Sequence, residues 1–256
     1  MKLISLAPLF MMLAVLWQEY PDTIFLRSSH CHRIDSIVYN EDRDQVQHFN
    51  YNSNGQLASI VSGADTTLFI YLDKALMRIN VGKQNDWDAS QYYALDKNGR
   101  ISQGMVKDKS GDLQIESGFE YDDLGRLGYA FYDTYANQTY QQFAYRYPSK
   151  EKTQVTVSDQ GNQVAAVYNI VLDTLAENCL NLDLNGIGHD LFPDDVMGIR
   201  ETFPVHYITQ LSASGDTLAH LTFSKLVKIK EGVWHQNQTD VLNGFTTSIN
   251  YFTTGR

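Results

Sequence analysis

The sequence lacks the short motifs that identify most enzymes and cofactor sites. It contains no Gly-x-Ser-x-Gly nucleophile elbow and no phosphate-binding loop. Its 30 acidic residues are too many for one carboxylate pair to be singled out as a glycosidase centre. We therefore predict no catalytic, metal-binding or cofactor-binding residue, and we expect no cofactor.

Cysteine and proline are scarce, with two and five residues in a chain of 256. Cys31 and Cys179 are too few and too far apart for a disulfide scaffold, and whether they pair is left open. No long amphipathic helical pattern is present, and only the short stretch Thr174 to Leu180 suggests a helix. These features favour a fold built of strands.

Basic residues are outnumbered by acidic ones, 20 to 30, which gives a formal net charge of −10. An acidic body repels phosphate, so we expect no nucleic-acid partner. The lysines Lys225, Lys228 and Lys230 are separated by apolar residues, and this pattern indicates one face of a strand rather than a docking patch.

The N-terminus carries the clearest targeting signal. Lys2 precedes an uncharged apolar run from Leu3 to Trp17, which is shorter than a membrane span and suits a signal peptide. We predict a signal peptide over residues 1–20 and one domain over 21–256. The protein is then exported to the periplasm, the outer-membrane surface or the extracellular space, with its cleavage site and anchoring left open.

A four-residue unit recurs along the body, with Asn, Asp or Ser first and Gly last. Such a unit predicts a type I turn followed by a glycine in the left-handed conformation, which is a common β-hairpin connection. The units are Asn52 to Gly55, Asp96 to Gly99, Asp108 to Gly111, Asp122 to Gly125, Ser158 to Gly161 and Ser212 to Gly215.

The residues beside these turns support the hairpin interpretation. The turns predict that Tyr51 pairs with Leu57, Leu95 with Ile101, and Tyr121 with Leu127, all apolar on apolar. Counting outward by two predicts that Phe119 and Tyr121 share a face with Leu127, Tyr129 and Phe131. The same count places Tyr93 and Leu95 with Ile101 and Met105.

The body is therefore predicted to be all-β, with about 12 strands in an antiparallel up-and-down hairpin meander that forms a barrel or a strongly curved sheet. Residues 181–203 differ, because glycine, proline and aspartate interrupt the apolar pattern. We predict a long loop there, and whether the sheet closes is left open. Further strands are expected at Thr67 to Leu72, Gln141 to Tyr147, Gln163 to Leu172, Val205 to Leu211, Leu218 to Leu226 and Thr246 to Phe252.

The units YNSNGQL, LDKNGRI and YDDLGRL resemble the YD repeats of Rhs-type proteins. Tyr121, Asp122, Gly125, Arg126 and Leu127 match the repeat core, although the irregular spacing of the units does not suit an Rhs casing. The whole layout resembles a family of exported proteins of uncharacterised function from Gram-negative gut and oral anaerobes. That resemblance implies a porin-like antiparallel fold and supplies no catalytic residues.

Two stretches deserve comparison with metal sites. On a strand, His30 and His32 would share one face, but no second ligand cluster accompanies them in the sequence. The stretch Asp183 to Gly188 looks like a calcium loop, but Ile187 stands where an oxygen ligand is needed. We interpret both as structural, and leave open a looser cation site at Asp190, Asp194 and Asp195.

Trp87 lies between Asp86 and Asp88, and Trp234 lies beside His235, so either ring suits sugar stacking or packing at a core edge. The leading hypothesis is a non-enzymatic binding or structural protein of the cell envelope, whose partner is a glycan or another envelope protein. A secreted glycan-active hydrolase and an outer-membrane β-barrel remain as alternatives.

Overall fold

The computed structural model describes residues 33–39, 46–82, 87–174 and 204–254. All of its regular structure is β-strand. The strands are β1 (Arg33–Tyr39), β2 (Val46–Tyr51), β3 (Leu57–Ser62), β4 (Asp65–Leu72), β5 (Ala75–Val81), β6 (Trp87–Leu95), β7 (Ile101–Lys107), β8 (Leu113–Tyr121), β9 (Leu127–Thr134), β10 (Thr139–Ser149), β11 (Lys152–Ser158), β12 (Val164–Leu172), β13 (Val205–Ser212), β14 (Thr217–Phe223), β15 (Val227–Lys230), β16 (Val233–Asp240) and β17 (Phe245–Thr254).

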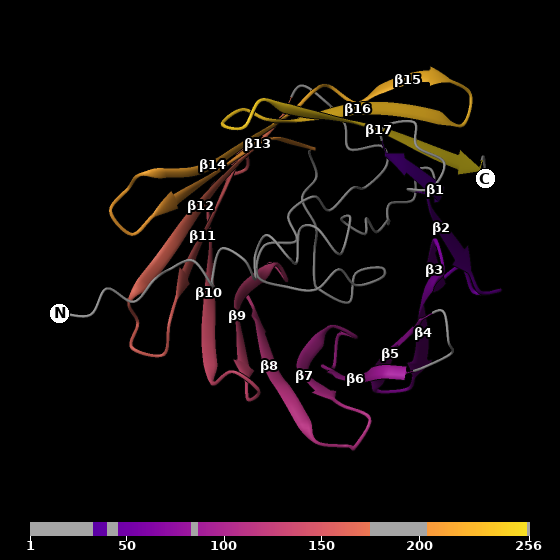
Figure 1. The fold of residues 1–256 in the computed structure, drawn as a ribbon, viewed down its shortest axis with the longest axis vertical. Coiled ribbons are helices and arrows are strands. Elements are labelled where there is room, and N and C mark those ends of the chain that lie inside the picture. Colours follow the sequence, from indigo (N-terminus) through magenta and orange to yellow (C-terminus); the bar gives the residue numbers. More distant parts are fainter. Residues whose placement is uncertain (1–32, 40–45, 83–86, 175–203, 255–256) are drawn as a thin grey trace.

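The strands form one antiparallel sheet that closes into a barrel (Figure 1). Each strand pairs with the next along the chain, except that β14 and β15 both pair with the same edge of β16. The seventeen strands therefore fill sixteen positions around the barrel. Pairing of β1 with β17, for example Ile37 opposite Tyr251, completes the ring. The predicted all-β hairpin meander is confirmed, and the sheet closes.

One face of the strands carries the core. Alternate residues such as Phe49, Phe119 and Tyr251 are at most 5% exposed and belong to one cluster that includes residues from most of the strands. Because Figure 1 shows no described element outside the wall, this buried face is the inner one. The inner face is therefore largely apolar.

The outer face is mixed. Hydrogen bonds join polar side chains of neighbouring outer positions, such as Gln154 Nε2 to Asn169 Oδ1 at 2.9 Å. Thr209 Oγ1 and His220 Nδ1 are 2.8 Å apart on the next two strands. Apolar outer residues gather on β4 to β7, where Ile70 lies opposite Met77. No helix among the described residues is long and apolar enough to cross a bilayer.

The apolar pairs beside the turns are confirmed, but the faces predicted further out are partly wrong. Tyr121 lies opposite Leu127, and the register then shifts by one residue on β9. Phe119 consequently faces Ala130 rather than Tyr129, so Tyr129 and Phe131 lie on the outer face. A second bulge, on β7, puts Met105 outside, opposite Tyr92. One extra residue reverses every later side chain on the strand.

The turn predicted at Ser158 to Gly161 lies one residue further along. Gly161 does not have a positive φ; instead Asn162 has φ 59°, and the Asn162 N–H donates to the Asp159 carbonyl. Asparagine tolerates this conformation better than other residues with a side chain. The turn is therefore Asp159 to Asn162, with asparagine in the role expected of glycine.

The number of strands was underestimated, because polar segments such as β11 carry a weak apolar signal. The strand predicted from Leu218 to Leu226 ends at Phe223, and Lys225 precedes β15. A register shift pairs Lys228 with Trp234 and Lys230 with Val233, so the three lysines do not share one strand face as predicted. Several predictions lie outside the described residues: the signal peptide 1–20, the cysteines Cys31 and Cys179, His30 and His32, the helix at 175–180, and the loop 181–203 with its acidic stretches.

Candidate functional site

Three of the repeated turns, those that follow β2, β6 and β8, gather polar groups at one end of the barrel. In the turn after β6, Asp96 Oδ1 accepts the backbone N–H groups of Asn98 at 2.8 Å and Arg100 at 2.9 Å. Gly99 has φ 78° and donates its N–H to the Asp96 carbonyl. The first residue of the turn therefore holds the whole turn through one side-chain oxygen, as asparagine, aspartate and serine do at such positions.

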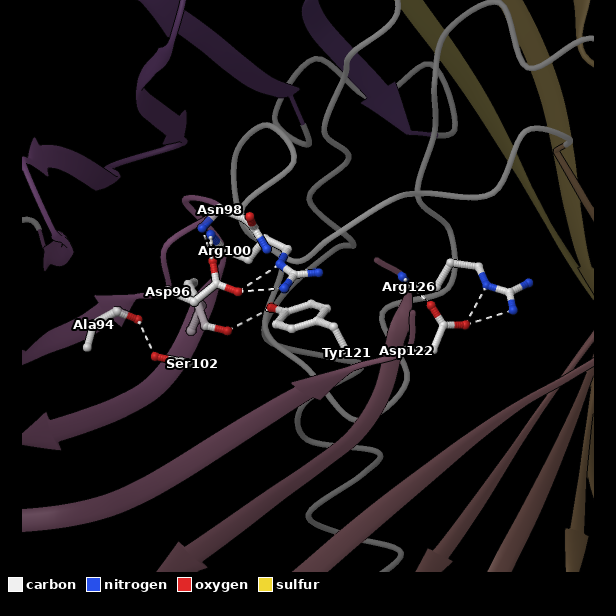
Figure 2. A network of polar contacts seen from close by, with 9 residues as sticks. Ala94, Asp96, Asn98, Arg100, Ser102, Tyr121, Asp122 and Arg126 are labelled. Atoms are coloured by element: carbon white, nitrogen blue, oxygen red, sulfur yellow. Dashed lines mark hydrogen bonds and ion pairs between the residues drawn. The ribbon is translucent and has the colours of Figure 1, made fainter. Parts of the chain in front are cut away.

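The second carboxylate oxygen of Asp96 binds the side chain of Arg100. Nε and Nη2 of Arg100 both donate to Oδ2, at 2.9 Å and 2.6 Å. Asp122 and Arg126 repeat this geometry in the turn after β8, with Nε at 2.9 Å and Nη2 at 2.7 Å from Oδ2 (Figure 2). Each turn thus fixes its arginine in one orientation.

Each fixed guanidinium lies over a tyrosine from the following hairpin. Cζ of Arg100 is 4.2 Å from the centroid of the Tyr121 ring, and Cζ of Arg126 is 3.9 Å from that of Tyr147. The Tyr121 hydroxyl donates to the carbonyl of Ile101, the residue after Arg100, at 2.7 Å (Figure 2). Two Asp–Arg–Tyr units therefore follow each other, and Tyr121 of the first unit directly precedes Asp122 of the second.

The tyrosine part of the unit extends further around the same end. The Tyr147 hydroxyl donates to the Leu127 carbonyl at 2.7 Å. Tyr51 and Tyr71 donate in the same way, to Ile34 at 2.8 Å and Leu57 at 3.1 Å. In each case the tyrosine at the end of one strand binds the carbonyl at the start of the preceding strand. These tyrosines tie adjacent hairpins together.

Electrostatics agree with this arrangement. Burial alone would raise the pKa of Asp96 and of Asp122, but hydrogen bonds from Arg100 and Arg126 outweigh it and hold both pKa values below the usual 3.8. Burial raises the pKa of Tyr121, although the nearby Arg100 charge opposes that change. At neutral pH the unit therefore consists of a carboxylate, a guanidinium and a neutral phenol.

This arrangement stabilises structure rather than supplying reactive groups. A general acid near neutral pH needs a carboxyl group with a raised pKa. The pKa values of Asp96, Asp122 and also Asp240 are lowered. Among the described residues, no group of three or more His, Cys, Asp or Glu side chains is placed to hold a metal ion.

Sequence reasoning identified the turns but missed the stacking of arginine on tyrosine. The signal in the sequence was an equal spacing. In both complete units the tyrosine follows, by 20 residues, the residue whose carbonyl its hydroxyl binds. Trp234 is partly buried and packs against the core cluster, which agrees with the core-edge interpretation. The side chain of Trp87 lies outside the described residues.

The comparisons with known proteins give a fold and no family. No family model matches the chain, and no curated protein matches it. The crystal structure of a porin-like protein from Bacteroides uniformis is similar, with a TM-score of 0.59 and 14% identity over 88% of this chain and all of the other. The crystal structure of TcdB2-TccC3-Cdc42 matches with a TM-score of 0.33 and 13% identity, over 82% of this chain and 13% of that one. The chain therefore has the antiparallel barrel fold of a porin-like protein.

Proposed function

We propose that the protein is an exported, non-enzymatic module of the cell envelope that acts by binding or by providing structure. The observation that carries the proposal is the closed barrel, in which the inner face is apolar and buried and the strand ends are fastened by Asp–Arg–Tyr units. The apolar N-terminal run and the porin-like fold support an envelope location.

The distribution of side chains supports a barrel that lies outside the bilayer core. A membrane barrel needs a continuous outward apolar band and usually a polar lumen. Here outward Ile70 and Met105 form part of an apolar patch on β4 to β7, while outward His220, Asn169 and Gln154 are polar. The apolar outer surface therefore does not continue around the ring.

Two measurements test this proposal. Fractionation of the native host should place the mature protein in the periplasmic, surface or secreted fraction, with an N-terminus beginning near residue 21. The chain from residue 21 onward should remain dispersed without detergent and should produce no conductance in planar bilayers. An unprocessed cytoplasmic protein, or stepwise conductance, would contradict the proposal.

The hydrolase alternative is tested by turnover. Asp96 and Asp122 are engaged by their arginines, so neither is free to act as an acid or a nucleophile. Release of reducing sugar from a panel of polysaccharides, abolished by a single carboxylate-to-amide substitution, would replace the binding proposal with an enzymatic one.

A further inference from the structure

One strand departs from the regular barrel. Among the described strands, β15 alone pairs with a single neighbour, β16. All four of its residues are exposed, including Val227 at 51% and Ile229 at 59%. Figure 1 shows β15 beside β16 at the top of the view. Its second edge is therefore uncovered by the rest of the described chain.

A defined break produces this edge. Between Phe223 and Val227 three residues stand opposite the two residues Gln236 and Asn237 of β16, so the chain bulges. The Ser224 backbone N–H donates to the Asn237 carbonyl at 2.8 Å, and the Asn237 N–H donates to Ser224 Oγ at 2.8 Å. Leu226 then turns into the core. The break is held by specific bonds and is not a frayed strand end.

The rest of the hairpin holds β15 against β16, with one extra residue, Ile229, between the paired positions Lys228 and Lys230. Gly232 forms the turn with φ 71°, and its carbonyl accepts the Thr253 N–H from β17 at 2.8 Å. Nζ of Lys228 lies 5.8 Å from the centroid of the Trp234 ring on β16. An edge that is already extended and supported loses little conformational freedom when another strand is added.

The charge around the edge indicates what kind of strand fits. Lys225, Lys228 and Lys230 lie within six residues of a chain whose formal net charge is −10. Lys228 also contacts Glu231, with Nζ to Oε2 at 2.8 Å. In a second copy of this chain, antiparallel pairing of β15 with itself would bring two lysine-bearing edges together, and repulsion between their like charges would oppose it. Lysines on an edge also oppose self-association in many natural sheets.

We infer that β15 is a docking edge for an extended acidic segment of another protein, which adds to the sheet beside β15 and places carboxylates near Lys225, Lys228 and Lys230. Main-chain hydrogen bonds to the open edge supply the strand pairing, and exposed Val227 and Ile229 supply apolar contact. The inference concerns an interaction surface and is independent of the compartment in which the barrel resides.

The test uses the whole chain and a short synthetic peptide in which threonine alternates with glutamate. Binding is followed by NMR, together with hydrogen exchange of the β15 amides. We expect binding with exchange protection confined to β15 and its neighbours. Alternate N-methylation of the peptide, which blocks strand pairing and leaves the charge unchanged, should weaken binding by about tenfold or more.

A charge-reversed variant supplies the second arm. The double variant Lys228→Glu with Lys230→Glu should no longer bind the glutamate peptide and should bind the corresponding lysine peptide instead. The matched double variant Lys97→Glu with Lys150→Glu should bind both peptides as the unchanged protein does. Folding of each variant is checked by circular dichroism. Equal binding of the N-methylated peptide, no binding at millimolar peptide, or dimerisation through β15 would each overturn the inference.

Discussion

The guanidinium of Arg100 lies over the ring of Tyr121, with 4.2 Å between Cζ and the ring centroid, although the two residues belong to successive hairpins. The same arginine is fixed by Asp96 within its own turn. A local turn and a contact between hairpins thus share one side chain, and the arrangement is repeated by Arg126 and Tyr147. Turn formation and hairpin docking should therefore be energetically coupled.

A double-mutant cycle measures that coupling. Arg100→Met and Tyr121→Leu, alone and together, should give a coupling energy of about 0.5–1 kcal/mol in urea denaturation, because the cation–π contact requires both partners. The cycle of Arg126 with Tyr147 should give a similar value. The control cycle of Arg100 with Tyr147 joins residues of different units and should give a value near zero. Equal coupling in the control would show that the contact is not specific.

Acidification should weaken the barrel through the same turns. Folding lowers the pKa of Asp96 and Asp122 below 3.8, so their contribution to stability is present above that pH and is lost as pH falls through the folded pKa values. Asp96→Asn combined with Asp122→Asn should be less stable at pH 7 and should lose less stability between pH 5 and pH 2, a range of about three units. Urea denaturation across this range checks the prediction, and parallel curves for the two proteins would contradict it.

The sequence was sufficient to predict the hairpins nearest the turns, because their geometry depends on a few adjacent residues. Tyr51 opposite Leu57 and Leu95 opposite Ile101 are both found. It was insufficient further out, where a bulge on β9 moves Phe131 to the outer face. A bulge cannot be located from the alternation of apolar and polar residues alone. The pairing of β1 with β17 joins residues far apart in the sequence, which no local pattern connects.

The residue with a positive φ is a glycine, Gly99, in one turn and an asparagine, Asn162, in another. The same substitution at the glycines of the two turns should therefore have different costs. Gly99 has φ 78° and open space around it, so Gly99→Ala should cost about 1 kcal/mol through backbone strain alone. Gly161 does not have a positive φ, so Gly161→Ala should change the unfolding free energy by less than about 0.5 kcal/mol. Asn162, with φ 59°, should tolerate glycine and not valine. Equal costs at Gly99 and Gly161 would restore the turn position first predicted from the sequence.

The ring of Tyr93 lies against Gly104 on the inner face, and this limits which substitutions the barrel accepts. A Cβ on Gly104 would lie 2.5 Å from Oγ of Ser117 and 2.7 Å from Cε1 of Tyr93, which is only 2% exposed. On the outer face, a Cβ on Gly118 would meet the ring of Phe131, which stacks on Tyr140 with 5.9 Å between centroids.

The two glycines should therefore respond differently to the same change. Gly104→Ala should destabilise by about 1–3 kcal/mol, because Tyr93 is enclosed by the core and cannot move away. Gly118→Ala should cost less, since the Phe131 ring can swing towards solvent and lose only its stacking on Tyr140. Thermal and urea denaturation of both variants measure the difference. Adding Tyr93→Leu should recover part of the loss in Gly104→Ala, whereas a larger cost at Gly118 would mean that the outer face is packed more tightly than the inner one.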